Sequence, residues 1–141
     1  METHKSFDVK RRELAPYGLT CEKWSPVPTP RLDRHNEIEI NYFPHGGATY
    51  LANSRMVEFP AQRLIVFWAL LPHKTMSFAS SDFYYTCTIP LNTFLSWKIS
   101  QKMCDDLFSG RQLVAPDATT HSLDEQLLSR WYQDLEGNPS A

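Results

Sequence analysis

Polar and apolar residues alternate along residues 33–43 of the chain. The odd-numbered positions are polar and mostly ionisable, while the even-numbered positions from 38 onward are apolar: Asp33, His35, Glu37, Glu39 and Asn41 against Ile38, Ile40 and Tyr42. A repeat of two residues is typical of a β-strand, because successive side chains point to opposite faces of a sheet. Two interpretations of the polar face are open: it faces water, as in most half-buried strands, or it lines a binding cavity.

Short segments with turn residues between them follow this strand. The pattern predicts strands at 48–52, 55–59, 75–78 and 83–89, and Gly46-Gly47 and Asn53-Ser54 are residues that tolerate the positive φ of tight turns. Residues 64–71 are almost continuously apolar, which predicts a strand buried on both faces. A succession of short strands of this kind predicts an all-β sandwich or barrel.

The apolar repeat becomes helical after residue 90. It predicts helices at 90–97 and 100–108, with Gly110 as a stop. A last helix follows the capping box Ser122-Leu123-Asp124-Glu125 and ends at Gly137, with one apolar stripe made of Leu123, Leu127, Leu128, Trp131 and Leu135. Strands followed by helices predict a mainly β domain with C-terminal helices.

The chain is expected to form a single domain over residues 1–141. Residues 1–34 are polar and Pro-rich, and we interpret them as an N-terminal arm and linker, with one edge strand within 17–24. Residues 35–90 hold the main strands, and residues 91–137 form the helical segment. A length of 141 residues and a 42% hydrophobic content are sufficient for one buried core.

Charge and cysteine content exclude several classes of function. The formal net charge is −2 and the longest basic run is Lys10-Arg11-Arg12, so this segment is not expected to bind DNA. The three cysteines, Cys21, Cys87 and Cys104, contain no CxxC pair and are expected to be reduced thiols that fill the core. No apolar stretch reaches membrane-spanning length, and the expected location is cytoplasmic.

Ionisable side chains on the first strand suggest two kinds of site. If His73 comes close to this strand, His35, Glu39 and His73 form a ligand set that suits Zn, Fe or Mn. Alternatively, Trp68 stacks on the C–H face of a sugar while Glu37, Glu39 and Asn41 accept or donate hydrogen bonds to its hydroxyls. Both readings compete with simpler ones, in which the histidines face solvent and Trp68 packs in the core.

A family resemblance joins these observations. His35-Asn36-Glu37-Ile38-Glu39-Ile40, followed by Gly46-Gly47 and then by residues 64–68 and 71–73, resembles the two cupin motifs in the N-terminal domains of AraC-type transcriptional regulators. The runs at 67–73, 89–97 and 130–135 are also similar to members of this family. The resemblance implies a cupin-like double-stranded β-barrel (jelly roll) that binds an effector, often a sugar. It also implies helices that support a homodimer.

The same resemblance implies that a C-terminal pair of helix-turn-helix motifs binds DNA, and we expect that domain to be absent from this chain. The chain departs from the metal-binding motif, because Asp33 stands where the first His is expected and no Gly precedes His73. His35, Glu39 and His73 remain as metal ligands, with Asp33 as a further oxygen donor.

The expected function is therefore the effector-sensing and dimerising domain of an AraC-type activator, which is not an enzyme. The expected effector contacts are His35, Glu37, Glu39, Asn41, Trp68 and His73. The alternative is a small metal-dependent cupin enzyme, an oxygenase or sugar isomerase, which uses His35, Glu39 and His73. A third reading is an interaction module whose interior is filled by side chains, and an interior too small for any ligand would favour it.

Overall fold

A computed structural model describes residues 4–116 and 121–137, and its fold is mainly β with helices at one side and one end. A five-stranded antiparallel sheet has the order β1-β7-β2-β5-β8, and a three-stranded antiparallel sheet has the order β4-β3-β6. The strands are β1 (Thr20–Trp24), β2 (Glu37–Tyr42), β3 (Ala48–Ala52), β4 (Arg55–Phe59), β5 (Ile65–Trp68), β6 (His73–Phe78), β7 (Tyr84–Pro90) and β8 (Leu113–Val114). Strand pairing does not close the two sheets into a barrel within the described part of the chain.

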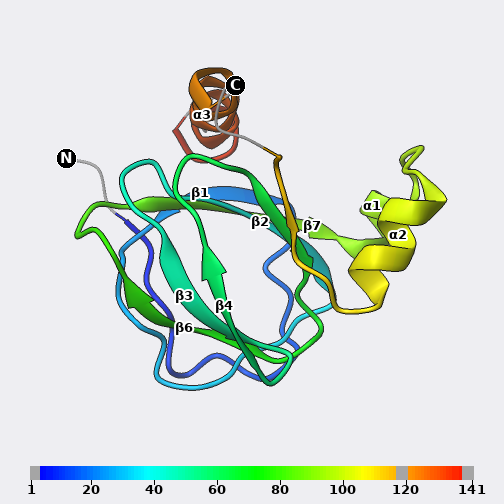
Figure 1. The fold of residues 1–141 in the computed structure, drawn as a ribbon, viewed down its shortest axis with the longest axis horizontal. Helices are drawn as coiled ribbons and strands as arrows, with labels where there is room; N and C mark the ends of the chain where they lie inside the picture. The colour runs from blue at the N-terminus through cyan, green and yellow to red at the C-terminus, as the bar shows by residue number, and fades with distance from the viewer. Residues whose placement is uncertain (1–3, 117–120, 138–141) are drawn as a thin grey trace.

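The two sheets face each other and share one core (Figure 1). Both sheets contribute side chains to its largest buried cluster, which consists of Phe43, Ala48, Tyr50, Phe59, Ile65, Phe67, Ala69 and Tyr84. Strand β2 is central in the larger sheet, where it pairs with β5 on one side and β7 on the other. The even-numbered side chains of β2 pack under the helices, and its odd-numbered side chains point into the space between the sheets.

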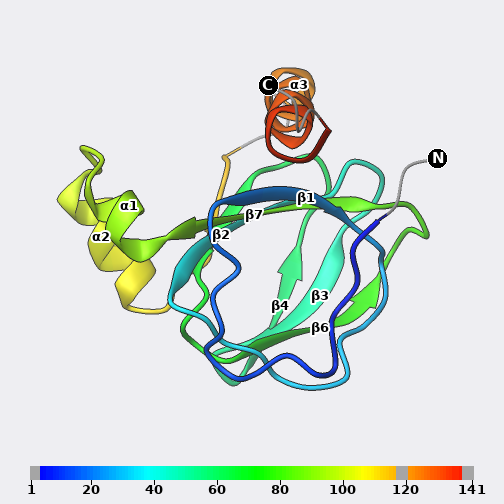
Figure 2. The same ribbon diagram turned by 180° about the vertical axis from the view of Figure 1, so that it is seen from behind.

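The helices cover the outer face of the larger sheet (Figure 2). Helices α1 (Leu91–Leu95) and α2 (Gln101–Phe108) pack on Ile38 and Ile89, and α3 (His121–Tyr132) packs through Leu128 on Cys21 and Cys87. A π-helical turn, η1 (Gln133–Gly137), continues α3. The apolar face of β2 thus lies under helices, and its polar face lies inside.

Most predicted strands are confirmed, although several bounds differ, and β2 and β5 are shorter than predicted. The hairpin of β3 and β4 turns at Asn53 and Ser54, whose φ values of 50° and 67° are the positive values that its two-residue turn requires. Residues 64–71 were predicted as one strand buried on both faces, whereas β5 ends at Trp68, and Val66 and Trp68 are only half-buried. The helical segment covers that outer face incompletely, so the apolar run does not mean double burial here.

The glycine pair before β3 has a different role from the predicted one. Neither Gly46 nor Gly47 has a positive φ. A Cβ on Gly47 would lie 2.2 Å from the backbone oxygen of Phe59, so this position needs glycine because another strand passes close to it. The predicted stop at Gly110 is confirmed, since its φ is 97° and its amide donates to the Leu107 carbonyl.

The final helix differs from its prediction in two respects. It begins at His121, so Ser122 lies within it, and the preceding residues 117–120, where an N-cap would lie, are outside the described residues. Leu128 is the buried member of the predicted apolar stripe, with 1% of its surface exposed. The other four members, Leu123, Leu127, Trp131 and Leu135, are 39–67% exposed. The stripe is thus a surface of the monomer.

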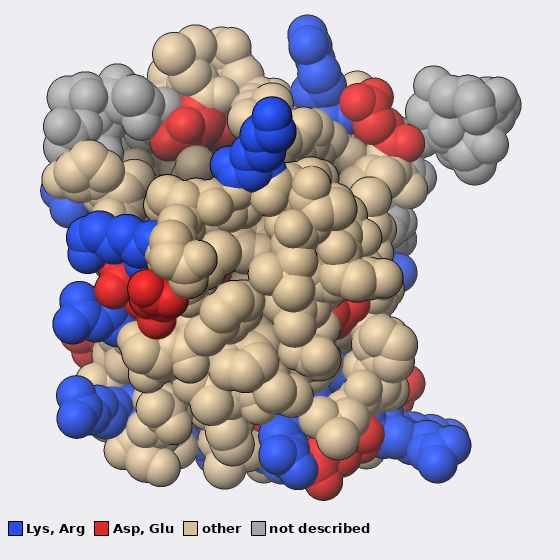
Figure 3. Space-filling model, turned by 90° about the vertical axis from the view of Figure 1, so that its right-hand side faces the viewer, with Lys and Arg blue, Asp and Glu red and all other residues tan. Residues whose placement is uncertain are grey.

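The surface also contains an uncharged area at the end formed by α1 and α2. Figure 3 shows this side, where uncharged residues fill the centre and Lys and Arg lie around the margin. Leu95, Trp97 and Met103 are 41–53% exposed there. Among the described residues, no helix combines the length and the apolar character needed to cross a membrane.

Candidate functional site

The polar face of β2 lies between the sheets and is almost inaccessible to solvent. Exposure is 1% for His35 and Glu37, 0% for Asn41, and 7% for Asp33 and Glu39. Ile38 and Tyr42, on the opposite face, are also fully buried, because the helices cover that side. Of the two interpretations of this face, the structure therefore selects the interior one.

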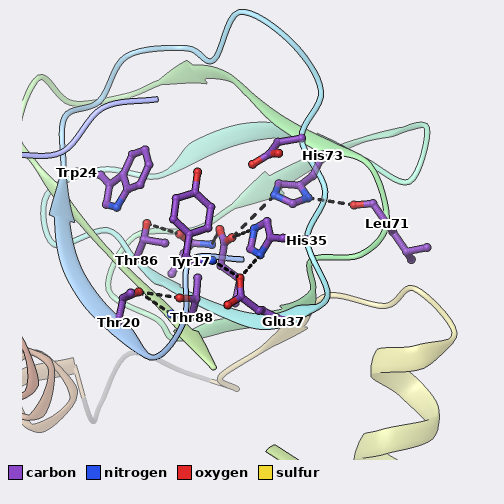
Figure 4. Close-up of polar contacts among 12 residues, drawn as sticks. Tyr17, Thr20, Trp24, His35, Glu37, Leu71, His73, Thr86 and Thr88 are labelled. Carbon is purple, nitrogen blue, oxygen red and sulfur yellow. Dashed lines mark hydrogen bonds and ion pairs between the residues drawn. The ribbon is translucent and has the colours of Figure 1, made fainter. Parts of the chain in front are cut away.

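A backbone bridge brings the second histidine to this face. The amide of Asp33 donates to the His73 carbonyl at 2.8 Å, and the amide of His73 donates to the Asp33 carbonyl at 3.0 Å. This bridge lies ahead of β2, at the first residue of β6, and it links the two sheets. The ligand atoms of Asp33, His35 and His73 consequently lie within 4.8 Å of one another. Figure 4 shows the two imidazoles side by side.

His35 is paired with two carboxylates. Its Nδ1 lies 2.7 Å from Oε1 of Glu37, and its Nε2 lies 3.3 Å from Oε1 of Glu39. Burial by itself lowers the pKa of His35, but the hydrogen bonds and negative charges of Glu37 and Glu39 outweigh it and raise that pKa to about 9. His35 is therefore an imidazolium at neutral pH.

The two carboxylates remain ionised inside the molecule. Burial alone would raise the pKa of Glu37 and Glu39, but the hydrogen bond to His35 and further contacts lower both pKa values. For Glu37 these contacts are the amides of Tyr17 and Gly18, which donate at 3.1 and 2.6 Å. For Glu39 they include the side-chain amide of Asn41, which donates at 3.0 Å and which itself accepts from Thr86.

The pKa of His73 is shifted in the opposite direction to the pKa of His35. Its Nδ1 lies 3.0 Å from the Leu71 carbonyl, and its Nε2 lies 3.8 Å from Oε1 of Glu39. Burial lowers the pKa of His73 more than the Glu39 charge raises it. The site thus combines one charged and one neutral imidazole, and Nδ1 of the neutral ring donates to Leu71.

The first part of the N-terminal segment, residues 4–18, covers this site and is called the arm from here on. Arg11 donates from Nε to both carboxylate oxygens of Asp33, at 3.2 and 3.1 Å, and its guanidinium lies 4.0 Å from the centre of the Tyr17 ring. The side chains of Arg11 and Asp33 are only 7% and 8% exposed. Arg31 also donates to the Arg11 carbonyl. The arm is therefore attached to the site through Asp33 and, by the amides of Tyr17 and Gly18, through Glu37.

A small cavity of about 50 Å³ remains between the sheets and the arm. A water molecule occupies about 30 Å³ in the liquid, so this space holds about one or two waters. Its walls are acidic, imidazole and aromatic groups, namely Glu22, Asp33, Glu39, His35, His73, Phe7, Tyr17, Trp24, Tyr50 and Tyr84, with Lys74 and four threonines. A hollow of about 400 Å³ adjoins it under the arm and shares Tyr17, Glu22 and Trp24 with it.

The structure brings together most residues predicted from the sequence. His35, Glu39 and His73 line the cavity, while Glu37 and Asn41 lie behind it and hold His35 and Glu39 in place. Trp68 does not line it. Its indole N–H donates to Asn36 at 3.1 Å on the outer face of β5, and its ring lies edge-on to Phe108.

Several lining residues were not found by sequence reasoning. Trp24 and Tyr50 lie at positions of β1 and β3 whose side chains point inward, and alternation along these strands could have identified them. The predicted edge strand within 17–24 includes Tyr17, whereas β1 begins at Thr20 and Tyr17 lies before it. Arg11, which contacts Asp33 at the edge of the site, comes from a segment without periodicity. Arg34, which is next to the site in sequence, pairs with Glu13 at the surface.

Asp33, His35 and His73 are residue types that bind metal ions, and their ligand atoms lie close together. The protonation of His35 and the ion pair of Asp33 nevertheless oppose metal binding. A ligating imidazole needs a free nitrogen lone pair, whereas both nitrogens of His35 are paired with carboxylates and the ring is protonated. The Asp33 carboxylate is already paired with Arg11. A divalent ion at Asp33, His35 and His73 would have to displace Arg11 and a proton.

Comparison with known proteins gave no match to a family model and no similar curated sequence.

Proposed function

We propose that this chain is the effector-sensing and dimerising domain of an AraC-type transcriptional regulator, with a sugar as effector and with the cupin-like barrel that the sequence motifs imply. The observation that carries the proposal is the buried cluster of Asp33, His35, Glu39 and His73, which lines an interior cavity and is directly attached to the N-terminal arm. The arm is thereby a candidate for transmitting the state of the cavity.

The cost of burying these charges favours a functional role. Moving carboxylates out of water lowers stability unless their pairing is complete, and apolar residues of similar size would often fill the same volume without that cost. Buried ionisable groups with strongly altered pKa values occur preferentially at functional sites. The threonine hydroxyls and aromatic faces around the cavity are groups suited to sugar hydroxyls and C–H faces.

The cavity as it stands is too small for a sugar, which by itself favours an interaction module, so the sensor proposal requires the arm to move. A space for about two waters is too small for a pyranose ring, so a sugar enters only when the arm moves away from Asp33 and Glu37. A ligand shifts a conformational equilibrium by its difference in affinity for the two states. Displacement of residues 4–18 supplies such a difference. The helix-turn-helix domain expected of such a regulator would then respond to the arm.

Sugar binding is tested by a thermal-shift panel of neutral mono- and disaccharides that includes galactose and melibiose. Binding to the folded state raises the melting temperature as ligand concentration increases. A matched variant, Glu39→Gln, removes a charge from the cavity wall and should reduce the shift, while Glu58→Gln on exposed β4 should not. The proposal is contradicted if no sugar stabilises the wild-type protein.

Dimerisation is proposed to use the exposed stripe of α3. Leu123, Leu127, Trp131 and Leu135 follow one another at intervals of four residues and are the apolar surface that a second copy could bury. Trp131→Glu should convert a dimer to a monomer in sedimentation-velocity analysis without loss of helical circular dichroism. A wild-type monomer at concentrations of about 100 μM would contradict this part of the proposal.

A metal-dependent cupin enzyme is the second candidate, favoured by the convergence of Asp33, His35 and His73 within 4.8 Å. Such a set suits Zn, Fe or Mn. The test is elemental analysis of protein purified without chelators. Stoichiometric metal that is lost in His73→Ala would favour this candidate over the sensor, and a metal-free wild type would remove it.

A further inference from the structure

Arg11 lines the hollow beside the cavity and contacts Asp33 and Tyr17, two residues of the cavity wall, in the way a bound cation would. Its guanidinium lies 4.0 Å from the centre of the Tyr17 ring and pairs with both oxygens of Asp33. It comes from an irregular segment, 22 residues away from Asp33 in sequence. A guanidinium that contacts a carboxylate and an aromatic face together is a typical mode of recognition for organic cations.

This internal cation is incompletely bound. Nη2 of Arg11 is buried and has no hydrogen-bond partner within the described part of the chain, although the side chain is only 7% exposed. A buried donor without an acceptor destabilises the conformation that buries it. Arg11 therefore binds at Asp33 and Tyr17 less tightly than a cation with all of its donors hydrogen-bonded would, so such a cation can compete with it.

The cavity next to Arg11 would also favour positive charge once Arg11 has left Asp33. Three carboxylates, from Glu22, Asp33 and Glu39, line it, and Glu37 lies directly behind His35. The balancing cations are the imidazolium of His35, Lys74 on the wall, and Lys5, which lies 3.8 Å from Glu22 and is half-exposed. Trp24 and Tyr17 are neighbours at this end of the cavity, with their rings edge-on to each other (Figure 4).

We propose that the effector is an organic cation, carrying an amine or guanidine group, which replaces Arg11 at Asp33 and Tyr17 and so releases the arm. This inference rests on the proposed sensing function and makes it more specific, since it assigns a charge to the effector. Arg11 acts as a built-in competitor: it keeps the arm closed until a cation takes its place. The 400 Å³ hollow beside Tyr17, Glu22 and Trp24 gives the remainder of the ligand room to bind.

The test compares binding of methylguanidine, galactosamine and galactose by isothermal titration calorimetry. The proteins are the wild type, Arg11→Ala and Arg12→Ala, where Arg12 is the exposed neighbour that matches the loss of charge. Because Arg11→Ala removes the competitor, it should bind methylguanidine at least ten-fold more tightly than Arg12→Ala does. Galactosamine should bind the wild type more tightly than galactose, which lacks the amine.

A second variant separates loss of the site from loss of the fold. In Arg11→Ala/Asp33→Asn both charges of the pair are removed, so no unpaired charge is left buried, and folding is checked by circular dichroism. This double variant should lose methylguanidine binding. Retained binding would overturn the assignment of Asp33 as the cation contact.

The outcomes distinguish this inference from the proposed function. If galactose binds as tightly as galactosamine and Arg11→Ala gains nothing for methylguanidine, sugar sensing stands and the cationic effector is rejected. If none of the three compounds binds any of the proteins, both are rejected. Tight binding of Zn²⁺ alone to Arg11→Ala, with no organic cation bound, would also overturn the inference in favour of a metal at Asp33, His35 and His73.

Discussion

His35 shows how single residues define this site. An imidazole with a pKa of about 9 is charged at neutral pH, and it balances Glu37 and Glu39 in a region almost inaccessible to bulk solvent. The same ring, placed alone in an apolar core, would be neutral, as His73 largely is. The difference comes from the two carboxylates that flank His35 on one strand face, at positions i+2 and i+4.

The charge of His35 should make the free energy of unfolding depend on pH. The folded pKa of His35 lies above the ordinary value of 6.5, so its contribution is fully present below pH 6.5 and is lost as the pH rises through 9. The rise from 6.5 to about 9 corresponds to about 3 kcal/mol. Urea unfolding of the wild type should therefore give a decreasing free energy of unfolding between pH 6.5 and 9.5.

A variant of His35 tests whether this residue causes the decrease in the free energy of unfolding with pH. In His35→Gln the decrease between pH 6.5 and 9.5 should largely disappear, even though the variant is less stable overall because Glu37 and Glu39 lose their charged partner. His45→Gln, at an exposed turn position, is the control and should keep the wild-type slope. An unchanged slope in His35→Gln would show that other groups cause it.

At the scale of elements, α3 has two neighbouring leucines with opposite environments. Leu128 is 1% exposed and packs on Cys21 and Cys87, whereas Leu127 is 44% exposed. Leu128→Ala should lower the free energy of unfolding by about 2 to 5 kcal/mol, as expected for a cavity in a packed core. Leu127→Ala should lower it by about 0.5 kcal/mol or less when measured on the monomer. Similar losses for both variants would contradict the orientation of α3.

The entry to β3 provides a second test at this scale. Gly47 lies so close to the Phe59 carbonyl that an added Cβ would overlap with backbone, whereas a Cβ on Gly46 would meet Ser80 and Ala79 at 3.1 Å or more. Gly47→Ala should therefore lower the free energy of unfolding by about 2 kcal/mol or more. Gly46→Ala should have a smaller effect, and chemical denaturation of both variants compares them directly. A larger loss for Gly46→Ala would contradict the placement of β3 against β4.

For the molecule as a whole, the sequence predicted the strands better than it predicted what surrounds the site. Alternation along residues 37–42 and the Asn53-Ser54 turn follow from local chemistry, and the structure confirms them. Alternation alone could not decide which face of β2 is inside, because that depends on where helices from residues 91–137 pack. The burial of the arm depends on long-range contacts, among them the ion pair of Arg11 with Asp33, for which Arg11 gives no local signal.

Because long-range contacts hold the arm, its opening can be measured separately from unfolding of the sheets. Hydrogen exchange reports local opening, and the amides of Tyr17 and Gly18 are held by Glu37 when the arm is closed. Arg11→Ala leaves Asp33 without its cation and removes the buried ion pair that helps to hold the arm, so exchange at these two amides should become about ten-fold faster or more. Amides of the central strand β2 should keep their protection, because they are paired on both sides with β5 and β7. In Arg12→Ala all of these rates should match the wild type. If Tyr17 and Gly18 exchange no faster in Arg11→Ala, then the Glu37 contacts hold the arm without Arg11, and displacement of Arg11 by a ligand could not release it.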